Sequence, residues 1–410
     1  MLSYLTIRMG RPDSPSPRAA RQRPDASARP DICVITTVHG PFDVRIFHKE
    51  CAVLRDAGYR VCLIAPSDQA PAVIDGITLI PLPVVRRRVV RMLVQPWRAL
   101  RIALRQRARA YHLHDPELMP IAVLLRLMRR RPVIFDAHED AETDMRSKPY
   151  LSPWVRQLAA AAVRLAERLC LPHVSAVITA HDGGADHLAG LGVCSTIIHN
   201  YVDAQDLPRV ELVAGRAPCL GYVGGVTLER GIVELLTAAQ MARRTHPTLR
   251  VLLIGPAPAD LRSRIETEFA EVAEFCGPLA QPEAMRLLAA RATIGVSTYL
   301  PLINYLYAEP TKVFEYMALG LPILCSNFPM WEGLVVATGC GISVDPTDPD
   351  AMCQGICDLL GRPQSELQAM AQRGIELSRT RFSWTAEAPR LIALYRNLGM
   401  IPRRDQVHEG

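Results

Sequence analysis

The chain has 410 residues, a net charge of +6 and 49% apolar residues. This length is enough for two globular domains, and the balance of apolar and charged residues excludes a fibrous or wholly disordered protein. Residues 1–30 are rich in Arg, Pro, Ser and Ala and lack apolar periodicity, so we predict a disordered tail there and a second short tail at 401–410.

Targeting and redox signals are sparse. The stretch before Arg8 is too short for the apolar core of a secretory signal, and no run of about 18 apolar residues predicts a membrane-spanning helix. The eleven cysteines form no C-x-x-C pair, and Cys33, Cys62, Cys219 and Cys325 lie in apolar runs. We therefore expect reduced, buried thiols in a cytoplasmic protein.

From Asp31 onward, short β-branched runs alternate with amphipathic stretches. Such alternation is typical of βαβ units around a parallel sheet. The predicted strands of the first half are 32–36, 61–65, 78–81, 110–112, 133–136, 176–179 and 196–198, with helical patterns that include 44–57, 116–128 and 153–170.

The alternation pauses at a mixed, polar segment and then resumes. We therefore predict a first domain at 31–200, a linker at 201–217 and a second domain at 218–384, followed by a helix at 385–400 that packs back on the first domain. The predicted strands of the second domain are 219–223, 250–254, 274–276, 293–297, 322–325 and 342–344.

The predicted fold is α/β, with two doubly wound, Rossmann-like parallel-sheet domains. Ligands of such sheets bind at the carboxyl ends of the strands, which indicates a site in the cleft between the two domains. Two such domains with unrelated roles remain an alternative.

The strand at 219–223 leads into a glycine turn, Gly224–Gly225, followed by Arg230 and a helical pattern. A glycine turn lets backbone N–H groups approach a phosphate, and the helix N-terminus and an arginine both favour an anion there. An ordinary turn between a strand and a helix is the alternative interpretation.

The segment 309–320, EPTKVFEYMALG, holds Lys312 and Glu315 three residues apart on one helical surface, with Thr311 as a candidate cap. Lys312 is one of three lysines in a chain whose basic residues are almost all arginine. An ammonium near a helix N-terminus is unfavourable unless an anion is also present, which a diphosphate would provide. Glu315 could accept both hydroxyls of a ribose, and a surface Lys–Glu pair is the alternative.

A loop after the strand at 133–136 carries His138 among the acids Asp136, Glu139 and Asp140. A loop at a strand end is a frequent place for ligand contacts, although a histidine that only hydrogen-bonds to its acidic neighbours would look the same. No D-x-D pair follows a strand, and Asp345, Asp348 and Asp350 are typical of a turn and a helix cap, so no catalytic metal is expected.

Taken together, these segments resemble the retaining glycosyltransferases of family 4, which have the GT-B fold. The resemblance covers about residues 31–398. It rests on VITTVHGPFDVRIFHKECAVLRDAGYRVCLIAP, HLHDPELMP, VIFDAHED, IIHNYVD, GYVGGVTLERG and PTKVFEYMALGLPILCSN, in that order.

The resemblance implies roles for individual residues. Glu315 matches the glutamate that holds the nucleotide ribose, Lys312 and Arg230 lie where the diphosphate and sugar bind, and His138 matches a first-domain histidine that touches the transferred sugar. The remaining positions implied at the site are Gly40, Gly224 and Gly225 on the donor side and Asp43, Arg45 and Glu139 on the acceptor side.

The sequence departs from the family pattern in two places. Gly225 stands where many members have an arginine that contacts the diphosphate. Tyr307 stands where the first of two paired glutamates is expected, and Glu309 is nearby but out of register.

The expected activity is transfer of a hexose from a nucleotide-diphosphate sugar, with retention, to a glycan acceptor that could be lipid-linked. The leaving phosphate can itself accept the acceptor proton, so no dedicated base is required. Neither a metal nor a cofactor is expected. A catalytically weak scaffold protein and a nucleotide-sugar epimerase remain alternatives.

Between Arg86 and Arg109 there are nine arginines and no acid, interspersed with aliphatic residues and Trp97. This pattern favours an interfacial helix on an anionic membrane, at the inner face of the cell membrane, over a merely solvated helix face. Nucleic acid is not an expected partner because aromatic residues are sparse in this block.

Overall fold

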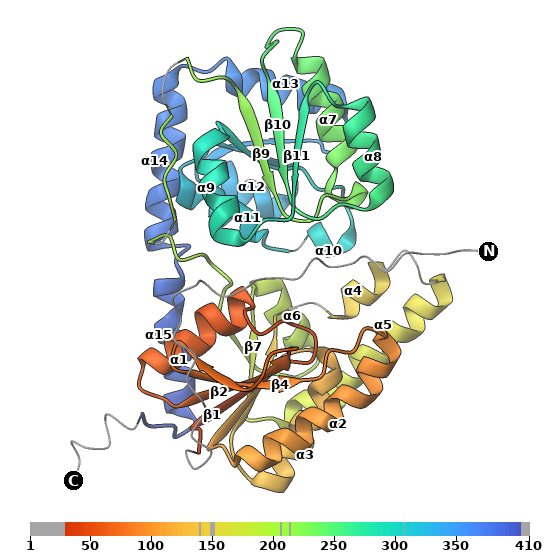
Figure 1. The fold of residues 1–410 in the computed structure, drawn as a ribbon, viewed down its shortest axis with the longest axis vertical. Coiled ribbons are helices and arrows are strands. Elements are labelled where there is room, and N and C mark those ends of the chain that lie inside the picture. The colour runs from red at the N-terminus through yellow and green to blue at the C-terminus, as the bar shows by residue number, and fades with distance from the viewer. Residues whose placement is uncertain are drawn as a thin grey trace. The chain divides into compact units, whose positions relative to one another are not determined.

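The computed structural model describes residues 29–138, 141–147, 152–205, 207–212, 215–306 and 308–402. The chain divides into two compact units: described residues 29–200 with 387–402 form one, here the first unit, and described residues between 201 and 386 form the other, the second unit (Figure 1). The predicted tails fall mostly outside these described residues, as do Glu139, Asp140 and Tyr307.

The first unit is built on an eight-stranded sheet in the order β3-β4-β2-β1-β5-β6-β7-β8. Its strands are β1 (Ile32–Ile35), β2 (Val61–Pro66), β3 (Ala72–Ile74), β4 (Ile77–Leu82), β5 (Ala110–Leu113), β6 (Val133–Ala137), β7 (Ala176–Thr179) and β8 (Ser195–Ile197). All seven predicted strands are present and parallel, in register with their neighbours.

One strand of this sheet was not predicted, and it is antiparallel. β3 pairs antiparallel with β4, and Ile74 lies opposite Ile77. The intervening Asp75 and Gly76 have φ angles of 48° and 76°. A two-residue Asp-Gly turn with positive φ at both positions is a strong hairpin signal, so the sequence carried the information for this edge strand.

Helices cover both faces of the first sheet. The helical segments are η1 (Val44–Cys51), α1 (Ala52–Asp56), α2 (Arg88–Gln106), η2 (Pro116–Leu118), α3 (Met119–Arg129), α4 (Ala141–Ser147), α5 (Pro153–Cys170), η3 (Leu171–His173) and α6 (Asp182–Gly190). Tyr111, Leu113 and Phe135 point into the core with α2, α3 and α6. Because side chains alternate along a strand, His112 and Asp136 point to the opposite face.

The second unit is built on a six-stranded, wholly parallel sheet in the order β11-β10-β9-β12-β13-β14. Its strands are β9 (Cys219–Val223), β10 (Arg250–Ile254), β11 (Ala273–Gly277), β12 (Ile294–Ser297), β13 (Ile323–Ser326) and β14 (Gly341–Val344). The strand order reverses between β9 and β12, and ligands of such sheets bind in the crevice at this reversal.

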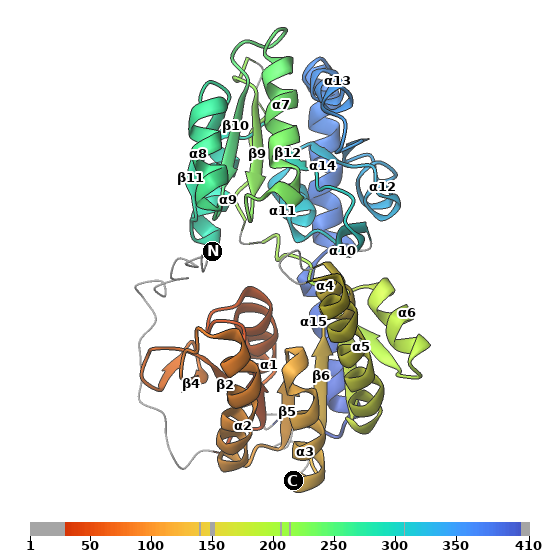
Figure 2. The same ribbon diagram turned by 90° about the vertical axis from the view of Figure 1, so that its right-hand side faces the viewer.

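The second unit has helices on both faces of its sheet (Figure 2). They are η4 (Leu228–Arg230), α7 (Ile232–Ala242), α8 (Ala259–Glu268), α9 (Gln281–Arg291), α10 (Ile303–Leu306), α11 (Thr311–Leu319), α12 (Pro329–Val335), α13 (Pro349–Leu360) and α14 (Gln364–Thr380). Asp348 caps α13 as predicted, because its side chain accepts from the amides of Asp350 and Ala351. The cap predicted for α11 was wrong: Thr311 is its first helical residue and Pro310 is the N-cap.

The last helix, α15 (Trp384–Asn397), packs on the first unit. The hydroxyl of Tyr395 lies 3.0 Å from Nδ1 of His112, and the Glu387 carboxylate accepts from the amide of His199. No described helix is both long and apolar enough to cross a bilayer. The four cysteines predicted to be buried are buried.

Candidate functional site

Gly224 follows the last residue of β9 and brings the backbone close to two neighbours. Its φ of 122° favours glycine, and an added Cβ would lie 3.1 Å from Nζ of Lys312. A Cβ on Gly255 would clash with the carbonyl oxygen of Gly224. Because neither glycine has a side chain, the two backbone segments approach closely and the ammonium of Lys312 can lie against the backbone at the end of β9.

Lys312 lies in the first turn of α11 and is only 7% exposed. Its Nζ has no hydrogen-bond partner among the described residues, and lies 4.0 Å from the ring centroid of Tyr222 and 4.6 Å from that of Tyr299. Burial lowers the pKa of Lys312 well below its ordinary value, and the nearby charge of Arg230 lowers it further. A buried ammonium held only by aromatic faces is electrostatically incomplete.

Arg230 is the last residue of η4, and its side chain contacts Tyr299, as that of Lys312 does. Its Cζ lies 4.0 Å from the ring centroid of Tyr299 and 4.8 Å from that of Tyr305. Two cations thus contact one ring at the strand-order reversal of the sheet. Their mutual repulsion would be relieved by an anion between or beside them.

Glu315 lies one helical turn beyond Lys312 and is also buried. Its Oε1 accepts a hydrogen bond of 2.8 Å from Nε2 of Gln281. The structure therefore places Gly224, Arg230, Lys312 and Glu315 in one region of the second unit. Glu309 lies half-buried just before α11, and Tyr307 is outside the described residues.

Several polar residues of this region were not predicted from the sequence. Tyr222, Tyr299 and Tyr305 form the aromatic surroundings of the two cations, and Gln281 holds Glu315. Ser297 and Thr298, at the end of β12, have buried hydroxyls without a partner in the described chain. Some of these residues lie at or near strand ends, but Gln281 begins α9 and Tyr305 lies in α10, so only the tertiary structure brings them to this region.

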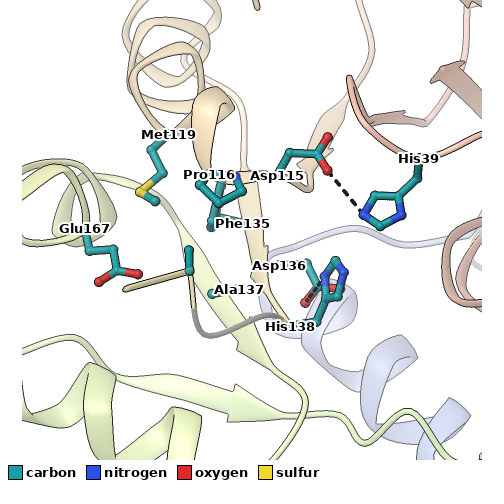
Figure 3. Close-up of a pocket in the computed structure, with 10 residues that line it drawn as sticks. His39, Asp115, Pro116, Met119, Phe135, Asp136, Ala137, His138 and Glu167 are labelled. Atoms are coloured by element: carbon teal, nitrogen blue, oxygen red, sulfur yellow. Dashed lines mark ion pairs between the residues drawn. The ribbon is translucent and has the colours of Figure 1, made fainter. Parts of the chain in front are cut away.

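A hollow in the first unit lies at the carboxyl ends of β5 and β6 (Figure 3). Its walls include His39, Asp115 and His138 on one side and Met119 and Glu167 on the other. The ring centroids of His39 and His138 are 5.6 Å apart. The histidine predicted to touch a sugar therefore faces a hollow with polar groups around it.

Asp115 organises one wall of the hollow. Its Oδ2 accepts from the hydroxyl of Thr36 at 2.8 Å and from the amide of Thr37 at 2.6 Å, and its Oδ1 lies 3.3 Å from Nε2 of His39. Its φ of 68° is strained for a non-glycine residue and costs about 1–3 kcal/mol. Asp115 belongs to the HLHDPELMP segment, and no role for it was predicted from the sequence.

Asp43 is tied to the other nitrogen of His39, at 3.3 Å. It also caps η1 by accepting from the amides of Arg45 and Ile46. Burial alone would raise the pKa of Asp43, but the hydrogen bond and the charge of His39 lower it. The amide of Asp43 donates to the carbonyl of Gly40, so this loop is held as a turn.

Beneath the hollow lies a buried ionic network. Arg45, only 3% exposed, donates from Nε to Oδ2 of Asp136 at 2.9 Å and lies 3.0 Å from Oε1 of Glu50. Against the effect of burial, Arg45 and then His138 hold the pKa of Asp136 well below its usual range. Burial raises the pKa of Glu50 well above its usual range, and the charge of Asp136 adds to the effect. The opposite directions of these two pKa shifts favour a charged Asp136 and a neutral Glu50 beside the single cation of Arg45.

Two histidines complete this network. The ring of His114 lies between the carboxyl groups, 3.5 Å from Glu50 and 3.4 Å from Asp136, and stacks on His112. Burial lowers the pKa of both imidazoles, which favours their neutral forms. His138 lies 3.5 Å from Asp136, so the network also contacts the residue that faces the hollow.

Four residues of this network carry side chains of the kind that bind metal ions. Potential ligand atoms of Glu50, His112, His114 and Asp136 all lie within 4.8 Å of one another. The guanidinium of Arg45 already supplies a positive charge to both carboxyl groups, and a divalent cation beside it would be repelled. The arrangement therefore fits a charge-compensated network better than a metal centre.

Comparison with known proteins decides the family. A model described as "Glycosyl transferase 4-like domain" matches residues 44–199, and one described as "Glycosyl transferases group 1" matches residues 217–362. The chain belongs to the GT-B glycosyltransferases. The resemblance in the sequence and the predicted fold class are thereby confirmed.

Individual relatives of this glycosyltransferase chain are distant. Glycogen synthase of Mycobacterium tuberculosis is 25% identical over 261 residues, which cover 60% of this chain and 59% of that protein. Sucrose-phosphate synthase of Thermosynechococcus elongatus superposes with a TM-score of 0.72 and 18% identity over 90% of this chain and 98% of its own. HepE of Anabaena in complex with UDP-glucose superposes with a TM-score of 0.67 and 14% identity, over 89% and 99%.

Arg45 was predicted on the acceptor side, and its guanidinium is enclosed by Asp136, Glu50 and the carbonyl of Ile198. The acceptor contacts of Arg45 and Asp43 stay predictions, and Glu139 lies outside the described residues.

Proposed function

We propose that the chain transfers a hexose from a nucleotide-diphosphate sugar to a hydroxyl of a glycan acceptor, with retention of configuration. The observation that carries this proposal is the buried ammonium of Lys312, which shares the ring of Tyr299 with Arg230 at the strand-order reversal. A diphosphate supplies the negative charge that this pair lacks. The UDP-glucose complex of HepE, which shares the fold, supports the same class of donor.

The chemistry follows from where charge develops. In glycosyl transfer the sugar acquires oxocarbenium character while negative charge grows on the leaving diphosphate. Lys312 and Arg230, together with the amide of Gly225, would stabilise that charge, since the amide of Gly224 already donates to the carbonyl of Ile254. Glu315, oriented by Gln281, would accept hydrogen bonds from the ribose hydroxyls.

Retention can be achieved without a dedicated base. A phosphate oxygen that leaves on the same face as the incoming hydroxyl can accept the acceptor proton as the C–O bond breaks. With two protein cations beside the diphosphate, no metal is needed for charge neutralisation, and His138 would contact the transferred sugar. This part of the proposal predicts full activity in the presence of a strong chelator.

The decisive experiment is transfer from radiolabelled nucleotide sugars by the purified full chain. Lys312→Met keeps the length of the side chain and removes its charge, and we expect kcat/KM to fall about 10²–10³-fold. Arg244→Gln, which removes an exposed positive charge elsewhere on the second unit, is the matched control and should leave the rate unchanged. NMR of the product tests retention directly.

Two outcomes would contradict the proposal. Equal rates for wild type and Lys312→Met would remove the lysine from the reaction. Tight binding of a nucleotide sugar without turnover on any glycan acceptor would instead identify a binding or scaffold protein.

A further inference from the structure

Helices α2, α3 and α5 lie side by side on one face of the first sheet (Figures 1 and 2). Their inner sides pack on the core of the first unit through residues such as Leu100 of α2, Leu125 of α3 and Ala166 of α5. Their outer sides together form a surface that we call the three-helix face. It belongs entirely to the first unit.

The three-helix face holds most of the exposed large apolar side chains of the described chain. There are 17 such residues, of which 11 lie on these helices: Val89, Val90, Met92, Leu93 and Trp97 on α2, Leu127 and Met128 on α3, and Trp154, Leu158, Leu165 and Leu169 on α5. The two tryptophans are 58% and 69% exposed. Concentration on one face is unusual for a monomeric surface and marks an interaction site.

The spacing of these residues makes them contiguous along each helix. On α2, Val89, Leu93 and Trp97 are each four residues apart and therefore form one stripe. On α5, Trp154 and Leu158 form one pair and Leu165 and Leu169 another, also four residues apart. The α5 stripe was not recognised from the sequence, where only residues 86–109 were singled out.

The charge of this face has one sign. The three helices carry ten arginines, five on α2, two on α3 and three on α5. Their only acid is Glu167, which is 4% exposed and lies 2.9 Å from Nε2 of His187. The partner of this surface must therefore accept both apolar side chains and a dense positive charge.

Two other partners fit less well. A symmetric dimer through this face would bring the arginines of both copies against each other, which is electrostatically unfavourable. Single-stranded nucleic acid would satisfy the arginines, but aliphatic side chains such as Leu93, Leu158 and Leu165 offer no ring on which a base can stack. An anionic bilayer satisfies both requirements, because tryptophans and aliphatic residues insert at the headgroup boundary while arginines bind lipid phosphates.

We propose that the three-helix face docks the protein onto an anionic membrane surface. Trp97 and Trp154, with their neighbouring leucines, enter the headgroup region, and arginines such as Arg101 and Arg105 bind anionic headgroups. Met119 of α3 and Glu167 of α5 also line the hollow at the carboxyl ends of β5 and β6, so the helices that dock also border this hollow. If the proposed transfer reaction holds, this arrangement favours an acceptor carried by a membrane lipid.

The test is flotation of the full chain with vesicles of phosphatidylcholine alone or of phosphatidylcholine containing phosphatidylglycerol. Wild type should float only with the anionic vesicles, and less so in high salt. Trp154→Ser/Leu158→Ser and Leu93→Ser/Trp97→Ser should each weaken partitioning at least tenfold. Arg101→Gln/Arg105→Gln should weaken it about thirtyfold, or about 2 kcal/mol at 1.4 kcal/mol per factor of ten.

Matched controls distinguish an effect of the three-helix face from a general effect of removing exposed apolar or charged side chains. Val336→Ser/Ile401→Ser removes two exposed apolar side chains elsewhere, and Arg244→Gln/Arg286→Gln removes two exposed charges elsewhere. Both should float like wild type, and circular dichroism should show that all variants are folded. The assay needs no turnover, so its result is independent of the transfer reaction.

Three results would overturn the proposal. The first is wild-type protein that does not float with anionic vesicles. The second is flotation that the α2 and α5 variants leave unchanged. The third is a dimer that dissociates in sedimentation experiments when Trp154 and Leu158 are replaced, because the face would then bind a second copy.

Discussion

Each unit buries a positively charged side chain, but the two units differ in whether carboxyl groups of the protein compensate that charge. In the first unit, Arg45 is enclosed by Asp136 and Glu50, with neutral histidines around them. In the second unit, Lys312 and Arg230 lie against tyrosine rings, and Nζ of Lys312 lacks a hydrogen-bond partner in the described chain. A compensated charge is part of the scaffold, whereas an uncompensated one is prepared for a ligand.

This difference distinguishes buried charges that orient other side chains from buried charges that bind a ligand. The charge of Arg45 is compensated by carboxyl groups of the protein without any bound molecule, and its network contacts His138 through Asp136. Its consequence is a fixed orientation of a side chain that faces the hollow. The Lys312 cluster is unfavourable in the empty protein and becomes favourable when an anion arrives, so part of the binding free energy comes from relieving that cost.

The largest expected effect comes from removing both carboxyl groups around Arg45. Glu50→Gln should change the free energy of unfolding by less than about 1 kcal/mol, because the raised pKa of Glu50 favours its neutral form, which Gln resembles. Asp136→Asn should cost more, but Glu50 can then ionise and pair with Arg45. The double variant leaves a buried guanidinium without a carboxylate and should cost about 3–5 kcal/mol.

Urea denaturation of the four proteins of this cycle measures the coupling. We expect the double variant to lose more than the sum of the two single losses, because each carboxyl group compensates for the other. Strictly additive losses would show that Glu50 does not replace Asp136, and would break the description of the network as mutually compensated.

Lys312→Met should affect stability with the opposite sign. Because burial lowers the pKa of Lys312, the unfolded chain binds more protons than the folded one at pH values between the folded and unfolded pKa, and stability rises with pH there. The cost of the buried ammonium is greatest below that range. The variant should therefore be more stable by about 1–2 kcal/mol in the absence of ligand, increasingly so at lower pH.

Thermal unfolding of wild type and Lys312→Met over a range of pH tests this sign. A nucleotide-diphosphate sugar at about 100 times its Kd should stabilise wild type by about 2.7 kcal/mol and the variant much less. A destabilised Lys312→Met protein would show that the aromatic contacts already satisfy the ammonium and would weaken the contrast between the two units.

The smallest effect is proton uptake on donor binding. A diphosphate beside Lys312 should raise its lowered pKa, so binding above the pKa of the free protein should take up a fraction of a proton. Calorimetric titration with a nucleotide-diphosphate sugar in buffers of different ionisation enthalpy measures this fraction. The uptake should disappear in Lys312→Met, and its persistence would assign it to another group.

Much of the fold could be predicted from the sequence because parallel strands buried on both faces are continuous apolar runs. All thirteen predicted strands are present, and the one missed strand, β3, follows from an Asp-Gly turn whose signal was overlooked. The cap of α11 was misassigned because Pro310 and Thr311 both suit a helix start, and helix boundaries are uncertain by a residue or two in any sequence-based prediction.

The sequence by itself determined the fold class, the family and the residues around Gly224, Lys312 and Glu315, because these depend on local periodicity and on motifs within a few positions. Only the tertiary structure decided that Tyr299 contacts both cations, that Arg45 is enclosed by Asp136 and Glu50, and that α5 extends the apolar arginine-rich face of α2. Strand order and helix packing bring together residues distant in the chain, and burial then determines which charges are compensated inside the protein and which await a ligand.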